Sequence, residues 1–236
     1  MTFEPIRIGN TVITKTKTNV YEIKNEASPQ LMKSIGDKAS FEATDVMTMR
    51  KYLKRVQHVT ELHAALRLVH DFGRQMQSLI ADGRGIACMG VDDVVIITHR
   101  DSDSFTHDSI NELDCTLGDS RMDPQFLFVN DHLIFELDND GALIIDHALP
   151  KKLSAFMSPE LQSLLKSPPQ SVHFKTIYHS AAQLIIYFLL NVDRITEGTE
   201  GTEGTEYLNP IKYTKLYWFL MRCLAPVSAE RKYVYI

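Results

Sequence analysis

The stretch AFMSPEL, residues 155–161, decides how the rest of this sequence is interpreted. A generic loop needs a turn-forming residue and some polar residues, but it does not need a Pro-Glu pair placed behind an aromatic residue and a methionine. Pro159 restricts the backbone at a junction between a strand-rich region and a helix. The role of Glu160 therefore depends on what flanks the stretch on either side.

Composition limits the classes of protein to be considered. The 236 residues are 44% hydrophobic and 23% charged, which is typical of a soluble globular protein. The net charge is −5 and the basic residues form no concentrated stripe, so no nucleic-acid ligand is expected. The N-terminal sequence MTFEPIRIGN lacks an apolar signal core, and the most apolar segment is about half of the ~20 residues that a membrane span needs, so no membrane contact is expected. Three widely separated cysteines predict free thiols and a cytoplasmic location.

Hydrophobic periodicity divides the chain into a strand-rich front and a mainly helical remainder. The front alternates as strands do, whereas the longest periodic segment, from Thr60, has apolar residues on one helical stripe and ends in glycines. Residues 180–191 are apolar on every face, which predicts a helix that is buried all round. The order of elements predicts an α+β fold. The predicted elements are a hairpin over residues 7–23, helices over 40–56, 60–80, 180–191 and 213–224, and short strands at VVII, FLFV, LIFEL and ALIID.

Two segments are predicted to lack regular structure. Residues 98–125 are polar and acidic with few large apolar groups, which is typical of a long surface insertion. Residues 196–206 read TEGTEGTEGTE, and a glycine at every third position would destabilise a helix. The repeat is therefore interpreted as a flexible acidic linker.

With its flanks, AFMSPEL resembles a motif of the protein kinases. In that family an Ala-Pro-Glu motif closes the activation segment, and FMSPEL is close to the common form YMAPEL. Further along, YHSAAQLIIYFLL resembles the central buried helix of the family, usually DVWSLGVILYELL, and RCLAPVSAERK resembles its CL..DP..R ending. The resemblance implies a buried ion pair between Glu160 and Arg231, because a buried carboxylate without a partner costs several kcal/mol. The alternative is a solvent-exposed loop glutamate.

The front of the chain resembles the small, strand-rich lobe of the kinases. NVYEI is similar to the strand that follows their glycine-rich loop, and LMKSI is similar to the next strand, which makes Lys33 the phosphate-contacting lysine. Glu42 shares the apolar stripe of the helix predicted over 40–56, so it is expected to point inward and to pair with Lys33 at a nucleotide site. The alternative is that the two are unrelated surface charges.

Several positions that carry catalysis in the kinase family hold other residues in this chain. Phosphoryl transfer needs cradled phosphates, bound magnesium and a carboxylate beside the attacking hydroxyl. The loop GNTVITKTKTNV keeps Gly9 but lacks the closely spaced glycines that let a phosphate approach. In GIACMGVDDVVII the resemblance puts Cys88 at the base and Asp93 at the magnesium-binding Asn, which leaves Asp92 and Asp93 as candidate catalytic carboxylates.

Three other motifs need an interpretation. In IIDHALP the resemblance makes Asp146 a metal ligand, although Ala148 replaces the hinge glycine. The segment DNDG, residues 138–141, matches part of a calcium-loop spacing, but His147 replaces the bidentate glutamate, so a turn is expected. The triplet HRD at residues 99–101 follows a strand instead of preceding one, so it is interpreted as a coincidence.

The sequence therefore predicts a two-lobed, protein-kinase-like fold with a reduced β-rich N-lobe over residues 1–58 and a mainly helical C-lobe over 59–236. The drifted motifs favour a pseudokinase that binds or scaffolds a protein partner and is similar to the divergent kinase-like proteins of large DNA viruses. A viral protein of this kind would be located in the host cytoplasm or the virion. One alternative is an active, atypical Ser/Thr kinase that uses ATP and Mg²⁺ with Lys33, Asp93 and Asp146. The other is a structural or interaction protein whose kinase-like motifs are accidental.

Overall fold

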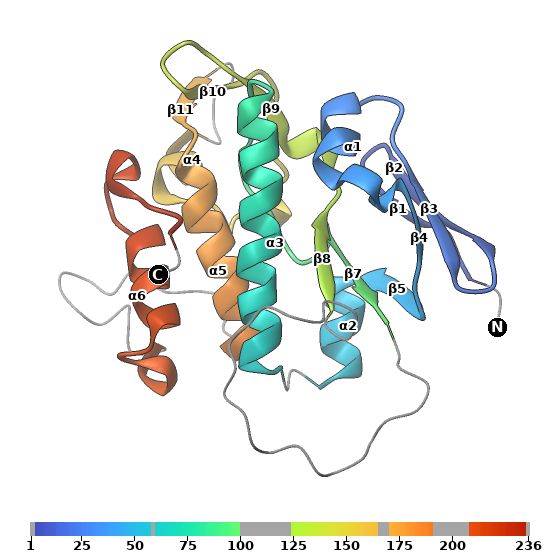
Figure 1. The fold of residues 1–236 in the computed structure, drawn as a ribbon. Coiled ribbons are helices and arrows are strands. Elements are labelled where there is room, and N and C mark those ends of the chain that lie inside the picture. Colours follow the sequence, from blue (N-terminus) through green and yellow to red (C-terminus); the bar gives the residue numbers. More distant parts are fainter. Residues whose placement is uncertain (1–2, 58–59, 100–123, 165–169, 191–207, 235–236) are drawn as a thin grey trace.

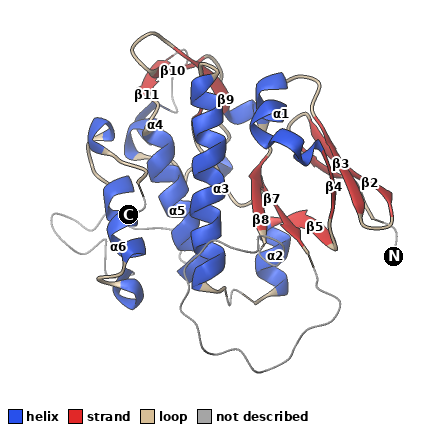
Figure 2. Cartoon of the chain, viewed as in Figure 1, coloured by secondary structure: helices blue, strands red, loops and turns tan. Residues whose placement is uncertain are grey.

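The computed structural model describes residues 3–57, 60–99, 124–164, 170–190 and 208–234. Within them the chain is an α+β fold, as predicted, and the long helix α3 (Leu62–Ala81) lies between an N-terminal sheet and the other long helices (Figures 1 and 2). Nearly all of the predicted insertion and the whole TEG repeat lie outside the described residues. None of the described helices combines the length and the apolar composition needed to cross a membrane.

The N-terminal sheet contains the hairpin predicted over residues 7–23. Its strands pair antiparallel in chain order, and they alternate so that Ile13, Tyr21 and Ile23 are buried on one face. Gly9 has a φ of 57° between the first two strands, a value that favours glycine. The four strands are β1 (Ile6–Ile8), β2 (Thr11–Lys17), β3 (Val20–Lys24) and β4 (Ser40–Glu42).

Residues 29–35 form a helix, so the expectation of a strand that carries Lys33 is wrong. Helix α1 (Pro29–Ile35) begins with proline at its first turn, where the missing N–H costs nothing. The hydroxyl of Ser28 accepts the Leu31 N–H (3.4 Å), which caps the helix. These local start signals outweigh the short apolar pattern that resembled a strand, and α1 packs against α3.

The prediction of a helix over residues 40–56 is also largely wrong. Only its last part is helical, as α2 (Met49–Arg55), because the Thr48 hydroxyl accepts the Lys51 N–H and starts the helix there. The earlier residues form β4 and β5 (Asp45–Thr48), and β5 pairs with β7 (Val94–Thr98), about fifty residues away. Glu42 consequently lies in an exposed position of β4, opposite Val20, and not on an inward helical stripe.

Side chains of α3 complete the three-stranded sheet β5-β7-β8. Strand β8 (Gln125–Phe128) has a free edge, and Gln75 covers it by accepting the Phe128 N–H (2.8 Å) and donating to its carbonyl (3.1 Å). One turn earlier on α3, the carboxylate of Asp71 accepts the Phe126 N–H (3.0 Å). Both side chains are buried, so they satisfy backbone groups that water cannot reach.

The third sheet confirms the predicted DNDG turn. Its strands are β11 (Gln170–His173), β10 (Ala142–Ile145), β9 (Ile134–Leu137) and β6 (Arg84–Ile86), in that spatial order. Between β9 and β10, Asp138 Oδ1 accepts the N–H groups of Asp140 (2.9 Å) and Ala142 (2.7 Å), and Gly141 has a φ of 76°. Among the described residues, no group of three or more acidic, histidine or cysteine side chains is arranged to hold a metal ion.

The predicted buried helix is present as α5 (Thr176–Leu190). Most of its residues are buried, and it packs between α3 and α6 (Lys215–Cys223), the last predicted helix. Helix α4 (Pro159–Leu164) starts at Pro159 and carries Glu160 in its first turn.

Glu160 and Arg231 form the predicted ion pair. Both guanidinium Nη atoms donate to the carboxylate, with Nη2–Oε2 at 3.0 Å, and Nε donates to the Ala225 carbonyl (2.8 Å). The Arg231 side chain is fully buried, whereas that of Glu160 is 25% exposed. Burial by itself would raise the pKa of Glu160, but the hydrogen bonds and charge of Arg231 outweigh it and lower the pKa. The stability that the pair provides is therefore present above the ordinary glutamate pKa and is lost as the pH falls through the lower folded value.

We expect Glu160→Ala to lower the free energy of unfolding by about 3 kcal/mol, because it leaves a buried guanidinium without its counter-charge. Urea denaturation at neutral pH measures the change. The matched control is Glu136→Ala, which removes the exposed pair with Arg84 (2.9 Å) and should cost no more than about 1 kcal/mol. Equal losses in the two variants would contradict this account of the buried pair.

His179 predicts a loss of stability in mild acid. Burial, and to a smaller extent the charge of Arg231, lowers the pKa of His179 from 6.5 to about 4, and its Nδ1 has no partner among the described residues. Below pH 6.5 this histidine therefore becomes protonated in the unfolded chain, whereas in the folded chain it stays neutral down to about pH 4. Between pH 7 and pH 4.5 we expect this residue to account for a loss of about 2 kcal/mol. His179→Gln should reduce the measured acid loss by that amount, and an unchanged pH profile would contradict it.

Candidate functional site

The loop between β6 and β7, which the sequence predicts to be the catalytic loop, is buried and held from two sides. Ser180 of α5 accepts the Met89 N–H (2.9 Å) and donates to the Met89 carbonyl (3.2 Å). At the other end of the loop, the Asp93 N–H donates to the Gly90 carbonyl (3.0 Å), and Asp93 Oδ2 accepts the Gly90 N–H (2.8 Å). The loop is thus fixed to the central helix and closed on itself.

Asp93 is the best-connected carboxylate of this loop. It is 1% exposed, and its second oxygen, Oδ1, accepts a hydrogen bond from Asn130 Nδ2 (2.7 Å). Burial raises the pKa of Asp93, although the hydrogen bonds from Asn130 and Gly90 oppose part of that effect. Both carboxylate oxygens are therefore already used inside the protein.

The β7–β8 hairpin explains why Asn130 meets Asp93. Val94 lies opposite Phe128 in the antiparallel register, so the residue before β7 lies beside the residues that follow β8. The Val129 N–H donates to the Asp93 carbonyl (3.0 Å), which extends this pairing by one step. Asn130 then starts a 3-10 turn over Asp131–Leu133 by accepting the His132 N–H (3.2 Å).

The β1–β2 turn contacts the 3-10 turn that contains Asp131 and His132. Asn10 donates to both oxygens of Asp131, through its backbone N–H to Oδ1 and through Nδ2 to Oδ2, each at 2.8 Å. Asn10 Nδ2 also lies 3.2 Å from His132 Nε2. We call the set Asn10, Asp131 and His132 the turn latch.

The space beneath the turn latch is filled. A Cβ atom on Gly9 would lie 2.3 Å from Asp131 Oδ1 and 2.8 Å from Asn130 Oδ1, so only glycine fits there. The buried hydroxyl of Thr11 donates to the Val129 carbonyl (2.6 Å), which holds β2 against the end of β8. The turn is therefore in direct contact with the loop region below it.

Neither Cys88, which is buried, nor Asp92, which is ion-paired, has surroundings that suit a catalytic base. Burial raises the pKa of the Cys88 thiol well above its usual range, and the neighbouring charge of Asp93 raises it further. Asp92 forms a two-point ion pair with Arg50 of α2, with Nε–Oδ1 at 2.6 Å and Nη2–Oδ2 at 3.0 Å. This pair connects α2 to the loop at a partly exposed position.

The structure does not bring Lys33 and Glu42 together, so the predicted pair between them is wrong. The ammonium of Lys33 contacts Asp82 at the C-terminal end of α3. The reason is the local structure described above, since Lys33 lies on a helix and Glu42 lies in β4.

Asp146 and Asp93, the two predicted metal ligands, have different partners. Asp146 is largely exposed after β10 and contacts His147 Nδ1 (2.7 Å), whose Nε2 lies 3.1 Å from the His132 carbonyl. Asp93 contacts Asn130, and no contact within the described residues joins the two carboxylates.

The sequence interpretation missed Asn10, Asn130 and Asp131. Each is a polar residue in a turn, which by itself carries no functional signal. Pairing the predicted strands VVII and FLFV across the intervening insertion would have placed the residues after FLFV beside Asp93.

No protein-family model matches the chain, and no curated protein is significantly similar to it in sequence. The chemistry of the site is therefore argued from its own residues.

We expect Asp131→Ala to lower the free energy of unfolding by about 1–2 kcal/mol, because it removes both acceptors of the turn latch. The control is Asp140→Ala, which replaces an exposed turn carboxylate and should cost less than about 0.5 kcal/mol. Chemical denaturation of both variants measures the difference. If the Asp131 variant is as stable as the control, the turn latch does not stabilise the fold.

Proposed function

We propose that the chain is a pseudokinase: a two-lobed, kinase-like protein that performs no efficient phosphoryl transfer and acts by binding a protein partner. The observation that carries the proposal is the turn latch. A carboxylate, Asp131, occupies the donors of the turn that would have to cover the nucleotide phosphates.

The arrangement of the described elements supports the kinase-like part of the proposal. A buried helix, α5, fixes the backbone of the loop that corresponds to the catalytic loop, through Ser180 and Met89. The Glu160–Arg231 pair ties the AFMSPEL stretch to the C-terminal region, as the resemblance implies. A small sheet with one short helix lies on the side of α3 away from α5 and α6 (Figure 1).

The electrostatics of the turn argue against a bound phosphate. In active kinases the backbone N–H groups of a glycine-rich turn face the phosphates. Here the Asn10 N–H faces Asp131, and a Cβ on Gly9 would collide with the same carboxylate. A phosphate at this place would meet a negative charge instead of free donors, and like charges repel at short range.

The side chains near the loop are already engaged or buried inside the protein, so they are poorly placed to hold magnesium or to take a proton from a substrate. If Asp93 corresponds to the magnesium-binding Asn of the kinases, its neighbour in this chain is Asn130, an amide that donates to it directly. Asp92 is neutralised by Arg50, and the Cys88 thiol is buried and stays protonated. Loss of a general base alone costs roughly 10²–10⁴-fold in rate, and lost positioning lowers the rate further.

We expect saturating ATP with Mg²⁺ to leave the melting temperature unchanged within about 1 °C. A ligand present at about 100 times its Kd stabilises the folded state by about 2.7 kcal/mol, which would raise the melting temperature by several degrees. A radiolabelled transfer assay should likewise give no signal above that of a heat-denatured sample.

The variants Lys33→Met and Asp146→Asn separate the proposal from its rival. Both residues are largely exposed, so neither substitution should unfold the chain. A magnesium-dependent thermal shift, together with transfer that either variant abolishes, would overturn the pseudokinase proposal and support an active, atypical kinase.

A further inference from the structure

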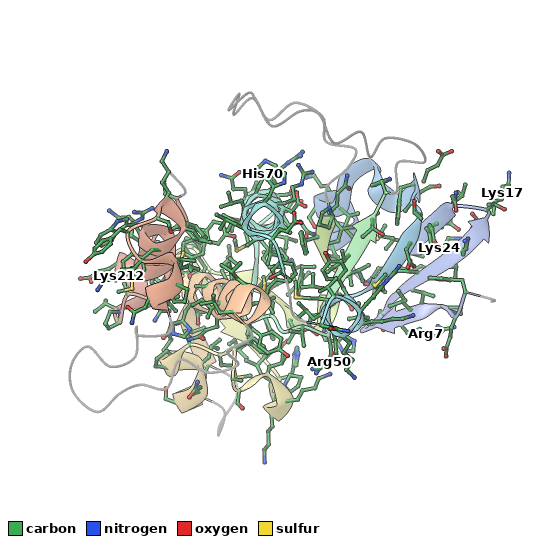
Figure 3. The ribbon with its side chains drawn as sticks, turned by 90° about the horizontal axis from the view of Figure 1, so that it is seen from below. Arg7, Lys17, Lys24, Arg50, His70 and Lys212 are labelled. Atoms are coloured by element: carbon green, nitrogen blue, oxygen red, sulfur yellow. The ribbon has the colours of Figure 1, made fainter. Side chains whose placement is uncertain are left out.

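One face of α6 combines exposed aromatic rings with basic side chains. Trp218 is 50% exposed and Tyr213 is 75% exposed, which is unusual for side chains of this size. Lys212, Lys215 and Arg222 lie in the same short segment of the chain. We call these five residues the α6 face. Its Lys212 lies at the opposite end of the molecule from Arg7, Lys17 and Lys24 of the N-terminal sheet (Figure 3).

Helical spacing aligns the three members of the α6 face that lie on the helix, whereas Lys212 and Tyr213 lie in the turn just before it. Positions 215, 218 and 222 follow each other at intervals of three and four residues, so their side chains lie along one side of α6. The opposite side of α6 is buried in the core through Leu216, Phe219, Leu220 and Cys223. The α6 face is therefore the side of this segment that the other described residues do not bury.

Contacts within the protein hold part of this face in place. Arg222 Nη2 donates to the Val234 carbonyl (2.6 Å), and Lys212 Nζ lies 5.3 Å from the centroid of the Tyr213 ring. The Trp218 ring packs edge-to-face against Tyr217, with centroids 5.0 Å apart. These side chains would therefore lose little conformational freedom when a partner binds.

The cations of this face have no counter-charge among the described residues. Arg50, Arg55 and Arg84 each pair with a carboxylate. Lys212, Lys215 and Arg222 pair with none in the described parts of the chain, as is also true of Lys17, and they differ from it by lying next to exposed aromatic rings. Arg222 Nε is in addition a buried donor without a partner there. Residues 208–234 contain five basic residues and one acidic residue, although the chain as a whole has a net charge of −5.

We propose that the α6 face binds an acidic segment of a protein partner. Exposed Trp, Tyr and Arg are the residues that most often dominate binding energy at interfaces, and unpaired cations favour a partner that supplies carboxylates. Nucleic acid is the less suitable ligand, because a backbone of phosphates needs a longer basic stripe than one helix face provides. This inference rests on the binding role proposed above, but its test involves neither ATP nor phosphoryl transfer, so either can fail alone.

The test uses fluorescence anisotropy with a labelled peptide in which Glu alternates with Leu and Gly, and a counterpart with Gln in place of Glu. The full chain should bind the Glu peptide, with affinity that falls between about 50 mM and about 300 mM salt, and should bind the Gln peptide at least about tenfold more weakly. Lys215→Glu and Trp218→Ala should each weaken binding by about tenfold or more. Both positions are exposed, and circular dichroism checks that the variants fold.

Matched controls separate the α6 face from general charge and apolar effects. Lys17→Glu makes the same charge reversal on the N-terminal sheet, and Leu62→Ala removes another exposed apolar side chain. Neither should change the affinity by more than about twofold, because neither residue belongs to the α6 face. Equal losses in Lys17→Glu and Lys215→Glu, or no binding of the Glu peptide, would overturn the proposal.

Two further outcomes would assign the face to another occupant. Labelled oligo-dT that binds more tightly than the Glu peptide, and loses affinity in Lys215→Glu, would identify a nucleic-acid site instead. Peptide binding that appears only after Glu197, Glu200, Glu203 and Glu206 are replaced by Gln would identify the chain's own repeat as the occupant. Either result would refute binding to an acidic partner.

Discussion

Arg231 is the constraint on which the C-terminal half depends. Its side chain is fully buried, and among the described residues the guanidinium is stabilised by Glu160 and by backbone carbonyls, including those of Ala225 and Pro226. This buried charge requires α4 and the segment after α6 to stay in contact. If they separated, the Arg231 guanidinium would be left without its carboxylate in an apolar environment. Burial lowers the pKa of His179 of α5, and the charge of Arg231 lowers it further. One cation therefore links three parts of the chain that are far apart in sequence.

Features encoded by a single strong local pattern could be predicted from the sequence. The stripe of α3, the all-round apolar surface of α5 and the DNDG turn each result from one short segment. The Glu160–Arg231 pair is non-local, but the resemblance of two motifs to those of the protein kinases implied it. Residues 29–56 could not be predicted in this way, because their apolar residues fit a helix and a strand equally well. Ser28 and Thr48 as caps, and the pairing of β5 with β7, decide the outcome there.

The candidate site was predictable only in part, for a different physical reason. Asp93 could be found because the resemblance places it at the magnesium-binding Asn of the kinases, but its partner Asn130 follows a strand that begins after a long insertion. Register between two strands depends on side-chain packing and not on the number of residues between them. The turn latch adds a third segment, the β1–β2 turn, whose contact with Asp131 no local pattern encodes.

The turn latch and the α6 face differ in how their charges are compensated. At the turn, Asp131 supplies from within the chain the negative charge that a phosphate would bring, so the donors of Asn10 are satisfied without a ligand. At α6, the cations remain without a carboxylate among the described residues, and the exposed ring of Trp218 lies between Lys215 and Arg222 in the helix. A buried or latched charge that is already satisfied gains little from a ligand, whereas an unpaired surface charge beside an aromatic ring gains a partner at low desolvation cost. Recognition is therefore expected on the outer helix rather than beneath the turn.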